Sequence, residues 1–125
     1  MKTKKQEQQS GFTLIEVIAV LVILAVLAAV AIPRYISLID DARTQALEGA
    51  VAAGMSHVSL SYGRLALQNG QEPTAAEVAT DAAANPPQSA DYDITFAASA
   101  SPGVNVTATE ADDATMTVTR EWLMP

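Results

Sequence analysis

The chain has 125 residues, a length that suits one domain, and half of its residues are apolar while 17% are charged. It contains no cysteine, which excludes disulfides, thiolate metal sites and a cysteine nucleophile. The net charge is −7, and the chain beyond residue 11 carries four arginines against thirteen carboxylates. Because such an acidic chain repels nucleic-acid phosphates, we expect no nucleic-acid partner.

Residues 12–32 form a long apolar stretch in which Thr13 and Glu16 are the only polar residues. As a helix, this stretch would be about 30 Å long, enough to cross the hydrocarbon core of a bilayer. Three lysines precede it, at positions Lys2, Lys4 and Lys5. The positive-inside bias predicts that the N-terminus stays cytoplasmic and that the chain beyond residue 33 is exported.

Glu16 is the one charged residue inside the apolar stretch. A carboxylate in a membrane span costs on the order of 3 kcal/mol on insertion scales, so we expect it to have a partner. No Lys, Arg or His lies elsewhere in residues 12–32, which excludes a salt bridge within the span. The partner would be a free α-amine made at Phe12 by proteolysis, in the same chain or in a neighbouring copy. The alternative is a protonated glutamate, or one that snorkels to the interface.

An ordinary secretory signal peptide is a rival interpretation of the N-terminal region. The lysines, the apolar core and the triplet Ala29-Val30-Ala31 match its general form. However, the uninterrupted core from Val17 to Ile32 is longer than the usual apolar region, and Glu16 interrupts its start. This interpretation makes Ile32, rather than Phe12, the first mature residue.

The run Ser10-Gly11-Phe12-Thr13-Leu14-Ile15-Glu16, followed by an apolar helix, resembles the class III signal peptide of type IV pilins and type II secretion pseudopilins. The resemblance implies that a membrane-embedded prepilin peptidase cuts between Gly11 and Phe12 and then N-methylates Phe12. It also implies that Glu16 pairs with the Phe12 amine when subunits assemble. Pro33 is similar to the proline that pilins commonly carry there, and we expect it to kink or loosen the helix.

This resemblance implies a structural filament subunit and not an enzyme, with no catalytic residues and no cofactor. The implied partners are the prepilin peptidase and methyltransferase, identical or related pilin subunits, and an inner-membrane assembly platform. The protein would be a single-pass precursor in the inner membrane, then part of a surface pilus or a periplasmic pseudopilus. The segment from Pro33 to Gly49 is similar to the mannose-sensitive haemagglutinin branch of type IV pilins. Two alternatives are a pseudopilin of a type II secretion system and a non-polymerising single-pass anchor whose head binds a partner.

Residues 33–70 are predicted to be the exported half of the same helix. Apolar side chains recur there at helical spacing and mark one buried face, formed by Leu47, Val51, Met55, Val58, Tyr62 and Leu65. The pair Asn69-Gly70 is a typical C-terminal stop.

The remaining residues are predicted to form a connector, 71–90, and a β-meander with a C-terminal tail, 91–125. Thr74 to Glu77 has the form of a capping box and would open a short helix that ends before Asn85. Three alternating runs predict three antiparallel strands: Tyr92, Ile94 and Phe96; Val104, Val106 and Ala108; Met116 and Val118. Trp122 would cover the sheet edge. The expected fold class is therefore α+β: a long N-terminal helix, transmembrane in its first half, with a small antiparallel sheet on its second half, as in lollipop-shaped pilins.

An acidic cluster lies in the predicted turn before the last strand, formed by Glu110, Asp112 and Asp113. Clustered oxygens suit calcium, which some major pseudopilins bind in a C-terminal loop, although a solvated turn is the simpler interpretation. His57 is the only histidine, and the serines near it on the same helix form no triad, so we expect a packed or surface histidine.

Overall fold

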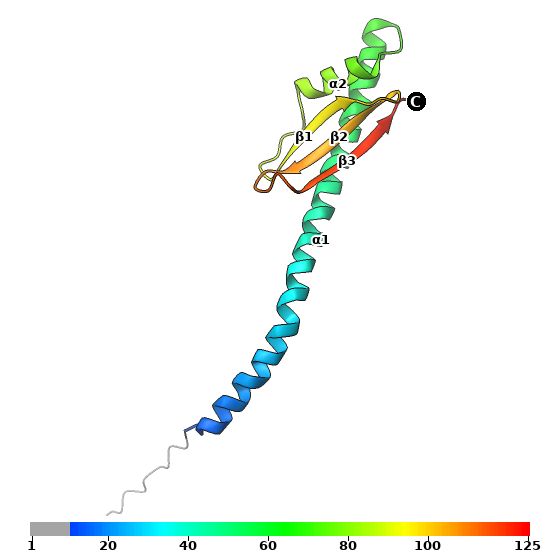
Figure 1. Ribbon diagram of the computed structural model, residues 1–125. Coiled ribbons are helices and arrows are strands. Elements are labelled where there is room, and N and C mark those ends of the chain that lie inside the picture. The colour runs from blue at the N-terminus through cyan, green and yellow to red at the C-terminus, as the bar shows by residue number, and fades with distance from the viewer. Residues whose placement is uncertain (1–10) are drawn as a thin grey trace, which may run out of the picture. The chain divides into compact units, whose positions relative to one another are not determined.

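The computed structural model describes residues 11–125, so the lysines of the predicted leader and Ser10 lie outside the described residues. The described chain forms α1 (Leu14–Asn69), α2 (Ala75–Ala84), β1 (Tyr92–Ala98), β2 (Gly103–Glu110) and β3 (Thr117–Leu123), as Figure 1 shows. It divides into two compact units, one that ends at Ile39 and one that spans Asp40–Pro125, and α1 contributes to both. The predicted α+β class is confirmed.

Helix α1 is 56 residues long and ends where the sequence predicted. Gly70 follows it with φ at 63°, a left-handed conformation that glycine adopts without strain, and its N–H donates to the Ala66 carbonyl at 3.0 Å. Pro33 lies inside α1, and helix is present on both sides of it. Because proline has no N–H, the Ala29 carbonyl lacks its usual helical donor. The kink at Pro33 stays a prediction.

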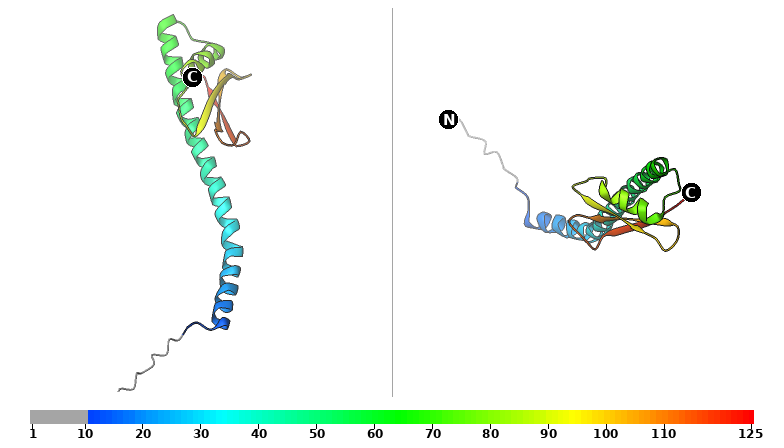
Figure 2. Two further views of the ribbon diagram at one scale, coloured as in Figure 1. Left: turned by 90° about the vertical axis from the view of Figure 1, so that its left-hand side faces the viewer. Right: turned by 90° about the horizontal axis from the view of Figure 1, so that it is seen from above.

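The three strands form an antiparallel meander with β2 at its centre, as predicted. Figure 2 shows this sheet beside the C-terminal half of α1. The inward residues of β2 are fully buried: Val104, Val106 and Ala108. Phe96 of β1 pairs with Val106, and Val118 of β3 pairs with Ala108, so all three strands turn the predicted apolar face inward.

The predicted apolar face of α1 covers this sheet. Leu47, Val51 and Val58 are buried, while the other three predicted positions, Met55, Tyr62 and Leu65, pack partly buried against the same core. Trp122 lies against α1 as well, because its indole N–H donates to the Ser59 hydroxyl at 2.9 Å. Its ring centroid lies 5.7 Å from that of Tyr62.

Gly54 sets how closely α1 approaches the sheet. A Cβ built on Gly54 would lie 2.5 Å from the Val106 Cγ1 and 3.1 Å from the Ile94 Cγ2. Carbon atoms in ordinary contact are about 3.5–4.0 Å apart, so there is no room for a side chain here. The sequence alone does not reveal this requirement, because it appears only when helix and sheet are packed together.

Helix α2 begins at the predicted capping box. The Thr74 N–H donates to a Glu77 carboxylate oxygen at 2.8 Å, and the Glu77 N–H donates to the Thr74 hydroxyl at 3.4 Å. Bonds from the Thr74 backbone, and then from its hydroxyl, lower the pKa of Glu77. The helix also adds to the core, since Val78, Ala79 and Ala82 are buried. The segment predicted as a connector therefore also stabilises the compact unit Asp40–Pro125, which we call the head.

His57 of α1 contacts a backbone carbonyl in the last turn of α2. The carbonyl of Ala82 would normally accept from the N–H four residues later, but that residue is Pro86. Ala82 is fully buried, so water does not replace this donor. The His57 Nε2 lies 3.2 Å from the Ala82 oxygen. Because a carbonyl only accepts, Nε2 carries the proton, and His57 supplies the donor that the proline removes.

We expect the substitution His57→Phe to lower the free energy of unfolding by about 1–3 kcal/mol, the typical cost of a buried polar group left unpaired. Phenylalanine retains an aromatic ring beside Phe96, whose centroid lies 5.9 Å from the His57 ring, but it cannot donate. His57→Gln retains an amide donor and is the matched variant, expected to lose clearly less. Urea titration of the detergent-solubilised chain, followed by Trp122 fluorescence, measures both. Equal losses in the two variants would show that the donor is unimportant.

Candidate processing and assembly site

Gly11 and Phe12 precede α1 and are exposed. No described atom outside its immediate neighbours lies within 4 Å of where a Cβ on Gly11 would be, so the described fold has no packing need for glycine there. Phe12 as a whole is 91% exposed. This peptide bond is thus open to an enzyme that acts on the precursor.

Thr13 and Glu16 together cap the start of α1. The Thr13 N–H donates to a Glu16 carboxylate oxygen at 2.7 Å, and the Glu16 N–H lies 3.4 Å from the Thr13 hydroxyl that accepts from it. This is the reciprocal capping box that Thr74 and Glu77 form at the start of α2. The sequence carries the signal for this box, a threonine followed three residues later by a glutamate, but the box is not among the features predicted from it.

The box gives the Glu16 carboxylate a partner that differs from those predicted from the sequence. We expected only an α-amine or a glutamate that is protonated or snorkels, whereas the structure shows a hydrogen bond to the backbone N–H of Thr13. The amine that cleavage would create belongs to Phe12, the residue directly before that N–H. A positive charge would therefore arise one residue before the N–H that already holds the Glu16 carboxylate in place.

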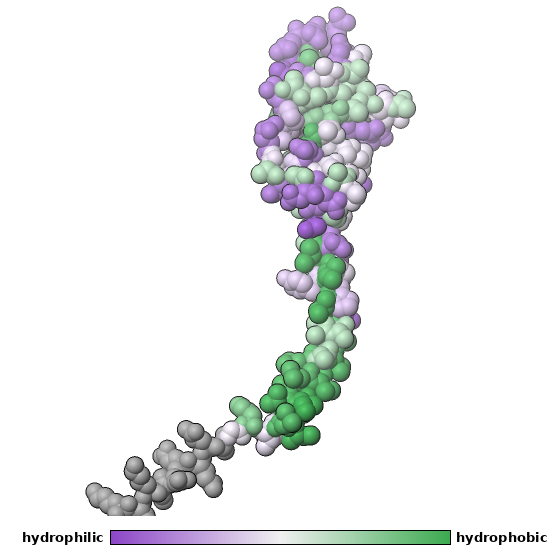
Figure 3. All heavy atoms as spheres, turned by 60° about the vertical axis from the view of Figure 1, so that its left-hand side comes forward, coloured by the Kyte–Doolittle hydropathy of each residue, from purple (hydrophilic) through white to green (hydrophobic). Residues whose placement is uncertain are grey.

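No other part of the described chain packs over the N-terminal half of α1. Every residue from 11 to 39 is exposed. In Figure 3 the lower coloured part of this helix is green, that is, apolar, and paler and purple atoms lie among green ones nearer the head. By length and composition α1 is able to cross a membrane. An apolar surface of this size requires lipid or other protein chains around it.

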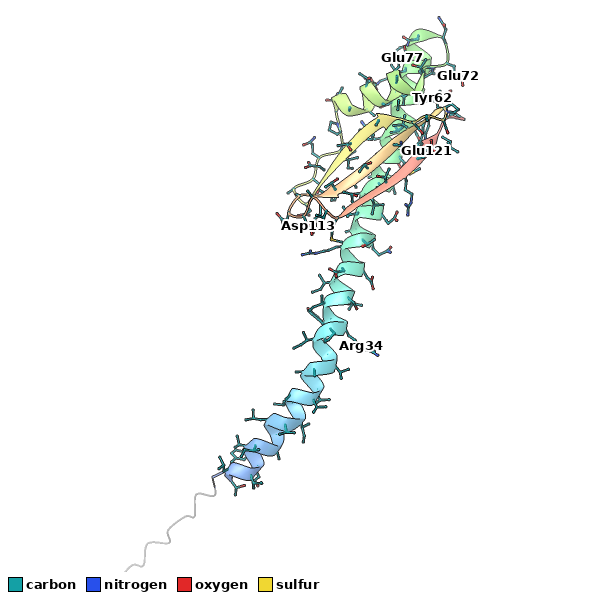
Figure 4. The ribbon with its side chains drawn as sticks, viewed as in Figure 1. Arg34, Tyr62, Glu72, Glu77, Asp113 and Glu121 are labelled. Atoms are coloured by element: carbon teal, nitrogen blue, oxygen red, sulfur yellow. The ribbon has the colours of Figure 1, made fainter. Side chains whose placement is uncertain are left out.

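The acidic turn does not gather its three carboxylates. Asp113, labelled in Figure 4, accepts from the Thr115 N–H at 3.0 Å and from the Thr115 hydroxyl at 2.6 Å. The Thr115 hydroxyl, and then its N–H, lower the pKa of Asp113. Glu110 instead faces Arg43, with Oε1 and Nε 3.6 Å apart. Among residues 11–125 the structure forms no group of three carboxylates or histidines able to hold a metal ion, so the weak calcium candidate gains no geometric support.

Comparison with known families gives a match for the N-terminal region. Residues 8–32 match the model of the prokaryotic N-terminal methylation motif. The match includes Gly11, Phe12 and Glu16, and it supports the resemblance to type IV pilins and pseudopilins. No curated protein and no solved structure matches the chain.

Proposed function

We propose that this pilin-like precursor is the subunit of a type IV pilus. In this proposal a prepilin peptidase cuts after Gly11 and N-methylates Phe12, and the mature chain then joins identical or related copies through the apolar half of α1. Before assembly the protein is a single-pass precursor in the inner membrane, and an assembly platform there moves it into the filament. Its role is structural, and it needs no cofactor.

The observation that carries this proposal is the uncovered helix behind the methylation motif. A membrane anchor alone would account for the apolar surface of residues 14–32. The exposed apolar side chains continue beyond the span, with Tyr35, Ile36 and Leu38 each more than half exposed. A bundle of several such helices would bury both parts at once, which favours polymerisation over a simple anchor.

Fibres sheared from cells that express the full chain test the proposal. We expect the mature chain to be a main component of extracellular fibres. Short periplasmic assemblies, together with a defect in protein secretion on deletion, would instead identify a pseudopilin. Membranes that hold the cleaved chain without any fibre would identify an anchor, and would overturn the proposal.

A further inference from the structure

Of the four arginines in residues 11–125, three form ion pairs and one does not. Three arginines form ion pairs in the head: Arg43 with Glu110, Arg64 with Asp81, and Arg120 with Glu48. Arg34 is the fourth, and among residues 11–125 no carboxylate forms an ion pair with it. Its side chain projects from α1 in Figure 4.

Arg34 also lies in an apolar stretch. It follows Pro33 directly, and Ile32, Tyr35 and Ile36 around it are each more than half exposed. Any partner that covers these apolar side chains also removes water from the guanidinium. A charge that loses water in this way is strongly unfavourable unless a counter-charge meets it.

Two carboxylates on the same helix also lack partners. Asp40 and Asp41 are exposed, and no described cation forms an ion pair with either side chain. They are the first acidic residues after Glu16. Each copy of the chain thus presents an unpaired cation followed by unpaired carboxylates.

We propose that Arg34 of one copy pairs with Asp40 of the next copy in the filament, and that this ion pair helps to fix the axial stagger between neighbouring subunits. The inference rests on the proposed assembly through α1. A residue at 34 in one parallel helix meets a residue at 40 in another when the copies are shifted by six residues, about 9 Å at 1.5 Å per residue. The partner is therefore a second copy of this chain.

The Phe12 amine and Glu16 require a shift in the same direction. In both pairs the cation precedes the carboxylate along the chain. Each pair therefore requires the copy that supplies the cation to be shifted toward its own C-terminus, relative to the copy that supplies the carboxylate. Four residues correspond to about 6 Å, and the long arginine side chain spans the difference of about 3 Å. The two pairs are thus compatible with one stagger.

Helical geometry favours Asp40 over Asp41 as the partner. At about 100° per residue, Asp41 lies roughly 20° from Arg34 around the helix, whereas Asp40 lies roughly 120° away. A head-to-tail assembly uses two different surfaces of each copy, one for each neighbour. Asp40 meets this requirement, and Asp41 lies on nearly the same face as Arg34.

Charge reversal and exchange test the pair in cells that express the full chain. We expect Arg34→Asp and Asp40→Arg each to reduce the fibre yield at least tenfold, and the double variant to recover most of it. Asp41→Arg is the matched control, and it should not rescue Arg34→Asp. Cleavage and membrane insertion, measured on the same cells, should be normal in every variant.

The outcomes separate this inference from the proposed function. If the wild type forms fibres but the double variant yields no more fibre than Arg34→Asp, the proposed ion pair is overturned. The proposed function as a filament subunit would still stand. Loss of Arg34→Asp from the membrane, with normal fibres from Asp40→Arg, would instead identify a lipid phosphate as the partner and contradict the inference. Absence of fibres from the wild type would contradict the proposed function itself.

Discussion

Replacement of Glu16 by alanine is expected to reduce fibre yield by two orders of magnitude or more, with insertion and cleavage unchanged. In the bundle the Phe12 amine would be left without its carboxylate, and a buried charge that loses its partner costs about 3–5 kcal/mol. A factor of ten corresponds to about 1.4 kcal/mol, so such a cost suffices for this loss. Sheared-fibre yield, normalised to the cleaved chain in the membrane, is the measurement.

Glu16→Gln distinguishes the two roles that the structure gives this residue. Glutamine retains an oxygen that can accept from the Thr13 N–H, as Glu16 does at 2.7 Å, but it has no charge to offer the amine. We expect Gln to be nearly as defective as Ala. Normal fibres from Gln would mean that the cap, and not the charge, is what assembly requires.

Gly54→Val is expected to lower the free energy of unfolding of the head by about 3 kcal/mol or more, the upper range for overpacked cores. The first atom of the new side chain would already lie 2.5 Å from a methyl carbon of Val106, which is itself fully buried. Valine side chains have little rotational freedom, so the neighbour cannot turn away. Urea titration of the detergent-solubilised chain, followed by the fluorescence of the single tryptophan, measures the loss.

Gly49→Ala is the matched control on the same helix. No atom lies within 4 Å of where its Cβ would be, apart from its chain neighbours and its own helix backbone. Alanine is the better helix former by about 0.8–1.0 kcal/mol, so this variant should be slightly more stable than the wild type. Equal destabilisation by both substitutions would refute the account of the helix-to-sheet packing.

The features that the sequence predicted well are those with local causes. The capping box at Thr74, the helix stop at Gly70 and the inward alternation of strands such as β2 each depend on residues within a few positions of one another. Such signals do not require knowledge of which elements pack together. The box at Thr13 was equally local, and it was missed because Glu16 was interpreted only as a charge.

The features that the sequence did not reveal join distant parts of the chain. The His57 ring reaches a carbonyl 25 residues away, and its role follows only from the proline that removes the normal donor. Gly54 is one of six glycines, and nothing in its neighbours indicates that the sheet lies against it. Contacts of this kind depend on the packed structure, which pattern alone does not determine.

The mass of the N-terminal peptide of the mature chain, purified from cells, tests the central claim most directly. We expect a peptide that begins at Phe12 and carries one added methyl group, and we expect Gly11→Val to leave the full precursor uncut. A mature chain that begins at Ile32, or one that retains residues 1–11, would contradict the assignment of this helix as a pilin-type assembly segment.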